Sequence, residues 1–163
     1  MIHCAMCDAG LYRDRVVAVC GAGNAGVIEA LYLARFCSEV HLLEKNAAPS
    51  ARASLLQDVM NEPKIELRCG VKPLEVVGDD SVTGIVIEQA DGKREVLDAY
   101  GVLVHVGYEP ATDYLHGALS LDSSNRVIVN ESFETNVPGV FVAGDLRAGS
   151  PRTVQVANST PSK

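Results

Sequence analysis

The chain has 163 residues and a formal charge of −7, with 47% apolar and 21% charged residues. This is the composition of a globular protein, and the length suits about one domain, or one domain with part of another. The acidic balance argues against nucleic acid or an anionic membrane as the main partner. No apolar run approaches the roughly 18 residues of a membrane-spanning helix, and the first residues do not form a signal peptide. We therefore expect a cytoplasmic protein.

The first half of the chain alternates strand-like and helix-like segments. Short apolar runs, typical of strands buried in a parallel sheet, occupy residues 16–20, 40–43 and 65–68. Between them, apolar residues recur at helical spacing after Gly26 and again over 51–61, where we expect Met60 to face inward. This β-α-β-α-β order predicts an α/β fold with a Rossmann-like parallel sheet.

The second half is richer in β segments. Runs at 74–77, 82–88 and 94–97, two of them separated by Asp91-Gly92, predict an antiparallel insertion over one face of the parallel sheet. An apolar run at 101–106 predicts a further buried strand, and we place a domain boundary at Pro110. Beyond it we expect a short helix at 112–119, strands at 126–130 and 140–143, and a frayed end from about residue 148.

A glycine motif joins the first expected strand to the first expected helix. Its residues form a G-x-G-x-x-G pattern, namely Gly21, Ala22, Gly23, Asn24, Ala25 and Gly26. The glycines allow a tight turn and a close approach to a pyrophosphate, and the helix N-terminus offers N–H donors to the phosphates. The pattern therefore predicts a dinucleotide site. The alternative is that the glycines serve only the packing of a strand against a helix.

A carboxylate supplies the second nucleotide-binding signal. Glu44 ends the second strand about twenty residues after the motif, where a carboxylate accepts hydrogen bonds from the adenosine ribose hydroxyls. It would repel the 2′-phosphate of NADP, whereas the nearby Lys45 and Arg52 could bind that phosphate. This balance favours NADH over NADPH as the form of NAD(P)H that binds.

The five cysteines fall into two groups. Three lie in apolar segments and are expected to be inert thiols, namely Cys20, Cys37 and Cys69. Cys4 and Cys7 form a C-x-x-C pair, which can cycle between dithiol and disulfide and often has one thiol of depressed pKa. Asp8 beside the pair is a suitable proton relay. The alternative is half of a zinc site, but no second C-x-x-C or H-x-x-H pair completes it, so we expect no metal.

The four histidines are scattered along the chain, and none pairs in the sequence with a nucleophile or an acid. They are His3, His41, His105 and His116. We expect each of them to be structural.

Three motifs together resemble the thioredoxin reductases and the flavoprotein subunit of alkyl hydroperoxide reductase. The first is C-A-M-C-D at residues 4–8, just upstream of the Rossmann unit. The second is G-V-L-V-H-V-G at 101–107, followed by Pro110, and the third is T-N-V-P-G-V-F-V-A-G-D at 135–145. They follow the family's order and cover nearly the whole chain, about residues 3–157. The resemblance identifies the chain as a pyridine nucleotide-disulfide oxidoreductase with NAD(P)H and FAD as the family's cofactors.

The resemblance also implies a role for the dithiol. Hydride would pass from NAD(P)H to FAD, electrons would then reach the Cys4–Cys7 disulfide, and the reduced pair would reduce a thioredoxin-like or other protein disulfide. Cys7 would face the flavin, Cys4 would exchange with the substrate, and Asp8 would donate and accept protons. The cofactor-binding residues that the other two motifs add are Gly107, Gly144 and Asp145. Asp145 would hydrogen-bond the ribityl chain of FAD.

The chain departs from the family in two respects. Glu44-Lys45-Asn46 stands where the NADPH-using members have His-Arg-Arg, and this is closer to the NADH-using hydroperoxide reductase branch. The resemblance also leads us to expect that these 163 residues lack the N-terminal half that binds FAD in the family and the Gly-rich helix after the last motif. We therefore expect residues 1–110 to be an NAD(P)H-binding domain with the dithiol, and 111–163 to be a partial FAD-binding segment.

This division leads to an expectation about activity. The isolated chain should be inactive unless a homodimer or another chain supplies the missing FAD half. The alternative is a non-catalytic dinucleotide-binding module.

Overall fold

The computed structural model describes residues 1–150 of the chain, which divides into two compact units. The first is Met1–Gly107 and the second begins at Tyr108. The segment that the sequence marks as frayed falls mostly beyond residue 150, outside the described residues. Within residues 1–150, no helix has the length and apolar character needed to cross a membrane.

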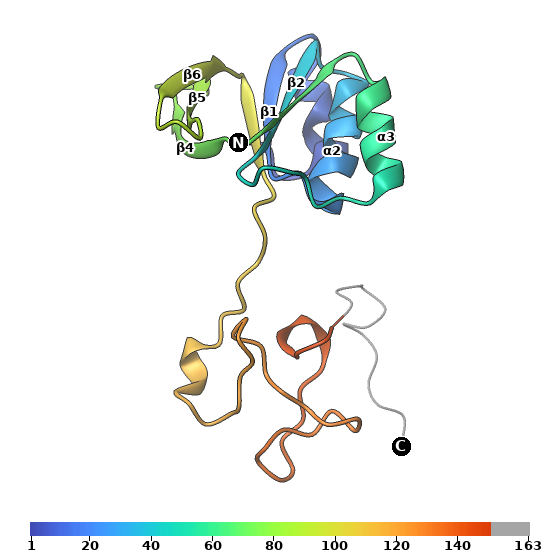
Figure 1. Cartoon of the computed structure of the whole chain (residues 1–163), viewed down its shortest axis with the longest axis vertical. Helices are drawn as coiled ribbons and strands as arrows, with labels where there is room; N and C mark the ends of the chain where they lie inside the picture. The colour runs from blue at the N-terminus through green and yellow to red at the C-terminus, as the bar shows by residue number, and fades with distance from the viewer. Residues whose placement is uncertain (151–163) are drawn as a thin grey trace. The chain divides into compact units, whose positions relative to one another are not determined.

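A four-stranded parallel sheet forms the centre of the first unit. Its strands lie in the order β3-β2-β1-β7, with bounds Val16–Cys20 for β1, Glu39–Glu44 for β2, Ile65–Cys69 for β3 and Gly101–Val104 for β7. Helices α2 (Asn24–Ala34) and α3 (Ala53–Asn61) cover one face of this sheet (Figure 1). The α/β fold and the β-α-β-α-β order predicted from the sequence are confirmed.

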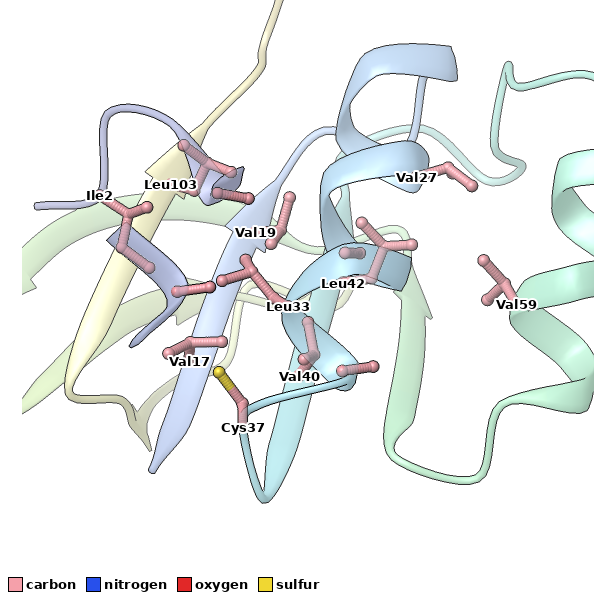
Figure 2. Close-up of a cluster of buried hydrophobic side chains, with 14 of the residues drawn as sticks. Ile2, Val17, Val19, Val27, Leu33, Cys37, Val40, Leu42, Val59 and Leu103 are labelled. Carbon is pink, nitrogen blue, oxygen red and sulfur yellow. The ribbon is translucent and has the colours of Figure 1, made fainter. Parts of the chain in front are cut away.

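The main core lies between the parallel sheet and the helices. Leu33 of α2 is fully buried there, together with Val17 and Val19 from β1 and Leu42 from β2 (Figure 2). These strands are buried on both faces, which is why they read in the sequence as continuous apolar runs rather than as alternating ones.

A three-stranded antiparallel sheet covers the other face of the parallel sheet (Figure 1). Its strands are β4 (Lys72–Val77), β5 (Gly84–Glu88) and β6 (Arg94–Asp98). Ile85 and Ile87 pack with Ala18 and Val102 of the parallel sheet in a second core. Between β5 and β6, Gly92 has φ +83°, so the hairpin expected at Asp91-Gly92 and the insertion it belongs to are confirmed.

The N-terminal segment joins the open edge of the parallel sheet. Ile2 forms a parallel bridge with Leu103, and its N–H donates to Val102 O at 2.8 Å. The chain then forms the one-turn helix α1 (Ala5–Asp8) and the 3₁₀ turn η1 (Ala9–Tyr12). Because Ile2 is paired beside β7, the C-x-x-C helix is held on the body of the first unit.

Two details of the first unit differ from expectation. Met60 is 74% exposed, so its expected inward orientation is wrong; in α3 only Val59 is fully buried, and Leu55 and Leu56 are partly buried. The last strand ends at Val104 rather than at residue 106, and Val106 is 62% exposed. Both errors come from counting an apolar residue at the end of an element as part of its buried face.

The second unit contains less regular structure than expected. The helix expected at 112–119 is reduced to the 3₁₀ turn η2 (Asp113–Leu115), and another such turn, η3, spans Gly144–Leu146. In place of the strands expected at 126–130 and 140–143 there are only isolated bridges within the described residues, including Leu121 with Val127 and Glu134 with Phe141. A strand requires a partner ladder as well as an apolar pattern, and residues 108–150 provide no such ladder.

The first prediction tests the core between α2 and the sheet. Leu33→Ala should lower the free energy of unfolding of the first unit by about 2–5 kcal/mol, because it removes fully buried methyl groups and leaves a cavity. Met60→Ala, on an exposed position of α3, should change it by less than about 0.5 kcal/mol. Urea unfolding followed by circular dichroism measures both, and equal effects would contradict the assignment of this core.

Candidate nucleotide and dithiol site

The glycine motif forms the turn between β1 and α2, and two of its glycines lie where no side chain fits. Gly21 has φ +104°, and a Cβ built on it would lie 2.1 Å from His105 O. A Cβ on Gly26 would lie 1.9 Å from Gly21 O. The turn, the start of α2 and the end of β7 are therefore in direct backbone contact, which is the steric requirement of a dinucleotide-binding turn.

Hydrogen bonds fix the shape of this turn. Gly21 N–H donates to Leu43 O at 2.7 Å, and the N–H groups of Ser50 and Ala51 both donate to Ala22 O at 3.2 Å. Asn24 Oδ1 accepts from Arg52 N at 2.9 Å. The loop after β2 is thus tied to the start of α2.

Helix α2 begins at Asn24, so the N–H groups of its first turn have no acceptor within the helix. Those of Asn24, Ala25 and Gly26 are the donors that remain for a phosphate. The Ala22 N–H is already engaged by a side chain, and Ala22 therefore contributes close backbone approach rather than a free donor. The residues of the glycine motif, Gly21 to Gly26, are brought together in one turn.

Glu44, at the end of β2, is the acceptor for that Ala22 N–H. It is only 5% exposed, and its Oε2 lies 2.9 Å from Ala22 N. Its Oε1 accepts from Asn46 N at 2.9 Å and from Asn46 Nδ2 at 2.7 Å. The carboxylate therefore lies at the glycine turn, as the sequence predicts. In this structure its hydrogen bonds connect that turn to the loop that follows β2. Lys45, next to it, is exposed.

The C-x-x-C pair lies on α1. Cys7 is exposed and Cys4 is half-buried, and both are free thiols. The Cys7 and Asp8 N–H groups both donate to Cys4 O, at 3.1 and 3.0 Å, which forms the single helical turn. Asp8 Oδ2 reaches back to accept from His3 N at 3.0 Å and Cys4 N at 3.4 Å. The dithiol and Asp8 are thus together, as expected.

The protonation of these groups differs from the sequence-based picture. A hydrogen bond with Cys4 and the charge of Cys4, followed by desolvation and the charges of Asp8 and Glu29, raise the pKa of Cys7. The expected lowering of one thiol pKa is therefore not found for Cys7. The backbone hydrogen bonds from His3 and Cys4 lower the pKa of Asp8, so Asp8 is an ionised acceptor at neutral pH rather than a store of protons.

The remaining cysteines behave as structural thiols. Burial raises the pKa of Cys20 and of Cys37 to about 11. Cys69, at the end of β3, is half-buried, and its pKa is raised first by burial and then by the charge of Glu44. None of the three is a thiolate at neutral pH, as the sequence predicts.

Two residues near the dithiol were not recognised in the sequence. Glu29 of α2 accepts a hydrogen bond from Ala5 N, in the C-x-x-C helix, at 2.8 Å. His105 Nε2 lies 3.5 Å from the other carboxylate oxygen of Glu29. No local motif marks Glu29, because its hydrogen bond joins positions 24 apart in the chain. His105 lies within the motif at 101–107, but the motif does not indicate a contact with Glu29.

A separate ionic cluster lies on β2 and β3. His41 Nδ1 is 2.9 Å from Glu66 Oε2 and 3.7 Å from Glu39 Oε1. Arg68 Nε lies 2.9 Å from Glu66 Oε1. Burial alone would raise the pKa of Glu66, but the hydrogen bonds and charges of Arg68 and His41 outweigh it and lower that pKa. Because Arg68 already neutralises Glu66, the cluster is an ion-pair network.

The second unit has a cavity of its own. Its volume is about 460 Å³, and its lining residues are Tyr108, Glu109, Pro110, Arg126, Asp145 and Leu146. Asp145, from the third motif, is exposed, and its Oδ1 accepts from Ser150 Oγ at 3.2 Å. Gly144 beside it is buried with φ +74°. Gly107, with φ +108°, ends the first unit.

The fold and the turn define a Rossmann-like α/β unit with a C-x-x-C helix beside its edge strand. The chain belongs to the pyridine nucleotide-disulphide oxidoreductase family, whose model matches residues 3–160. The chain is thus similar in sequence to this family over nearly its full length, as the three motifs predict.

Individual relatives support the family assignment. The chain is 34% identical over 157 residues to a thioredoxin reductase of Mycoplasma pneumoniae, covering 95% of this chain and 50% of the relative. It is 37% identical over 144 residues to an alkyl hydroperoxide reductase component of Staphylococcus epidermidis, covering 88% of this chain and 28% of the relative.

Solved structures give the same result. Thioredoxin reductase from Lactococcus lactis superposes with a TM-score of 0.84 at 29% identity, covering 95% of this chain and 52% of that one. The T. acidophilum enzyme gives a TM-score of 0.83 at 26% identity, with the same two coverages. The chain therefore spans about half the length of these thioredoxin reductases.

The second prediction tests the glycine turn. Gly26→Ala should destabilise the first unit by roughly 1–3 kcal/mol, because the new methyl group displaces the Gly21 carbonyl. Gly10→Ala is the control, since a Cβ there meets nothing within 4 Å. Thermal unfolding followed by circular dichroism compares them, and the same melting temperature for both variants would show that the turn tolerates a side chain.

Proposed function

We propose that this chain is the nucleotide-binding and dithiol portion of an NAD(P)H-dependent flavoprotein disulfide oxidoreductase. The observation that carries the proposal is the attachment of the C-x-x-C helix to α2, the helix that follows the glycine turn. Glu29, one turn along α2 from Gly26, accepts the Ala5 N–H at 2.8 Å. A non-catalytic nucleotide-binding module would have no need for an exposed thiol pair held at this place.

The nucleotide is proposed to bind at the Gly21–Gly26 turn. Its pyrophosphate would lie on Gly23 and on the N–H groups at the start of α2, where the helix dipole favours negative charge. The adenosine ribose would lie toward Glu44, whose carboxylate would exchange part of its bonding to Ala22 and Asn46 for the ribose hydroxyls. Because the Glu44 carboxylate lies at this point and would repel a 2′-phosphate, we propose that NADH binds more tightly than NADPH.

The residues lining the cavity of the second unit suit part of a flavin nucleotide. Arg126 can pair with a phosphate, and Asp145 can accept a hydrogen bond from a ribityl hydroxyl. When bound, FAD supplies the transfer of electrons from a reduced nicotinamide to a disulfide. We propose that the rest of the FAD site comes from a part of the protein that the relatives have and this chain does not span, or from a second chain.

The dithiol performs the last step of the proposed reaction. Reduction of the Cys4–Cys7 disulfide breaks one S–S bond and takes up two electrons and two protons. The reduced pair then attacks a protein disulfide, and the two electrons pass to that substrate as the Cys4–Cys7 disulfide re-forms. Asp8, ionised beside the pair, accepts a proton from a thiol as it becomes a nucleophile.

We propose a thioredoxin-like protein as the substrate, by analogy with the M. pneumoniae relative named thioredoxin reductase. We propose that Cys7 faces the flavin and that Cys4 exchanges with the substrate, as the family resemblance implies. A cytoplasmic location is proposed on the same basis, since a thiol-reducing enzyme works in a reducing compartment.

The third prediction concerns the nucleotide. NADH should bind the purified chain roughly tenfold more tightly than NADPH, because the Glu44 carboxylate repels the 2′-phosphate. Glu44→Gln removes the charge but keeps an acceptor for Ala22 N–H, so this variant should lose most of the preference. Isothermal titration of both nucleotides against both proteins measures it. Tighter binding of NADPH by the unaltered chain would refute the role given to Glu44.

The fourth prediction concerns the dithiol. Mild oxidation should produce a Cys4–Cys7 disulfide that dithiothreitol reverses, while Cys20 and Cys37 stay reduced because they are buried. Alkylation followed by peptide mass analysis identifies each thiol, and Cys4→Ser is the control in which no disulfide should form. Recovery of both Cys4 and Cys7 as free thiols after oxidation would rule out the redox role.

A further inference from the structure

Glu29 belongs neither to the glycine motif nor to the C-x-x-C motif. It nevertheless contacts both the C-x-x-C helix and the residue that follows β7. Its Oε2 accepts from Ala5 N at 2.8 Å, and its Oε1 lies 3.5 Å from His105 Nε2. The side chains of Glu29 and His105 are 27% and 15% exposed. His105 follows β7, and its N–H donates to Cys20 O at 2.7 Å, which continues the sheet by one residue.

The topology explains why these groups meet. Ile2 and Leu103 form a parallel bridge, so the chain segments on either side leave it in the same direction. Cys4 follows Ile2 by two residues, as His105 follows Leu103. Glu29 reaches this place from α2. His105 Nε2 is buried and has no hydrogen-bond partner within residues 1–150, and the Glu29 carboxylate lies 3.5 Å from it.

The donors at the start of the C-x-x-C helix are occupied by carboxylates. Asp8 accepts from the N–H groups of His3 and Cys4, and Glu29 accepts from that of Ala5. Free N–H groups at a helix N-terminus normally stabilise a cysteine thiolate and lower its pKa. Here those donors stabilise two carboxylates instead, and the two negative charges lie close to the thiols.

We propose that Glu29 is a positioning residue for the dithiol, which holds the C-x-x-C helix α1 against α2 through its hydrogen bond from Ala5 N–H. His105 completes the arrangement by offering its buried ring nitrogen to the other carboxylate oxygen. This inference rests on the proposed function only in treating the pair as a redox centre.

The pKa of Cys7 is consistent with this geometry. Its hydrogen bond to Cys4 and the charge of Cys4 raise it first, then desolvation, and then the charges of Asp8 and Glu29. The ionisable groups around α1 come from four segments. They are Met1 and His3 before it, Tyr12 of η1 after it, Glu29 of α2 and His105 after β7, beside Cys4 and Asp8 of α1 itself.

The test is the pH dependence of Cys7 alkylation by iodoacetamide in the reduced chain, resolved by peptide mass analysis. Glu29→Gln keeps an acceptor for Ala5 N–H but removes the charge, so the midpoint of the profile should move to lower pH. Glu75→Gln, an exposed change on β4, is the matched control and should reproduce the unaltered profile. A Glu29→Gln profile that coincides with that of the control would overturn the placement of Glu29 beside the dithiol.

A second measurement isolates the hydrogen bond from Ala5 N–H. Amide hydrogen exchange at Ala5 should speed up in Glu29→Ala, which loses the acceptor, and should stay slow in Glu29→Gln. Unchanged exchange at Ala5 in Glu29→Ala would overturn the link between α1 and α2. Both measurements use reduced protein without nucleotide or flavin. Failure of the Cys4–Cys7 disulfide to form would therefore count against the proposed function alone.

Discussion

The first unit depends on a close backbone contact at the start of α2. Gly21 passes against the carbonyl of His105, and Gly26 passes against the carbonyl of Gly21, at distances that exclude a Cβ on either glycine. This contact brings β1, α2 and β7 to one point. It places the first turn of α2, with its unpaired N–H groups, over the ends of the strands, which is where α/β sheets bind ligands. It also fixes His105 near α2, where its ring lies beside Glu29, the residue that accepts a hydrogen bond from the C-x-x-C helix.

The sequence predicted the first unit well because its signals are local, whereas the second unit depends on pairing that no local pattern supplies. A strand buried on both faces is a short apolar run, and a glycine turn is recognised by spacing alone. Met60 and Val106 show the limit, since an apolar residue at the end of an element continues the pattern whether or not the fold covers it. In the second unit, Val127 is fully buried and Phe141 is 58% exposed, yet neither run forms a strand. An apolar run takes up strand geometry only beside neighbouring strands, and residues 108–150 do not pair these runs into a sheet.

For the dithiol, too, the sequence predicts the position of the residues better than their chemical properties. Its position beside the nucleotide domain followed from the motif, but the direction of the Cys7 pKa did not. A C-x-x-C pair on a helix suggests a stabilised thiolate. Here the hydrogen bond with Cys4 and the charge of Cys4, followed by desolvation and the charges of Asp8 and Glu29, raise the pKa of Cys7 instead. Asp8 is adjacent in the sequence and could be anticipated, whereas Glu29 comes from α2, 24 positions away from the Ala5 N–H that it accepts.

Two buried or half-buried carboxylates therefore perform parallel tasks in this unit. Glu44 accepts the Ala22 N–H of the nucleotide turn, and Glu29 accepts the Ala5 N–H of the dithiol helix. Asn24, where α2 begins, and Glu29 are separated by about 7–8 Å along the helix axis, given a rise of about 1.5 Å per residue. The donors for the phosphates and the anchor of the dithiol thus belong to one rigid turn and a half of helix. The Glu29 carboxylate thus joins α1 and α2 through one direct hydrogen bond, that from Ala5 N–H.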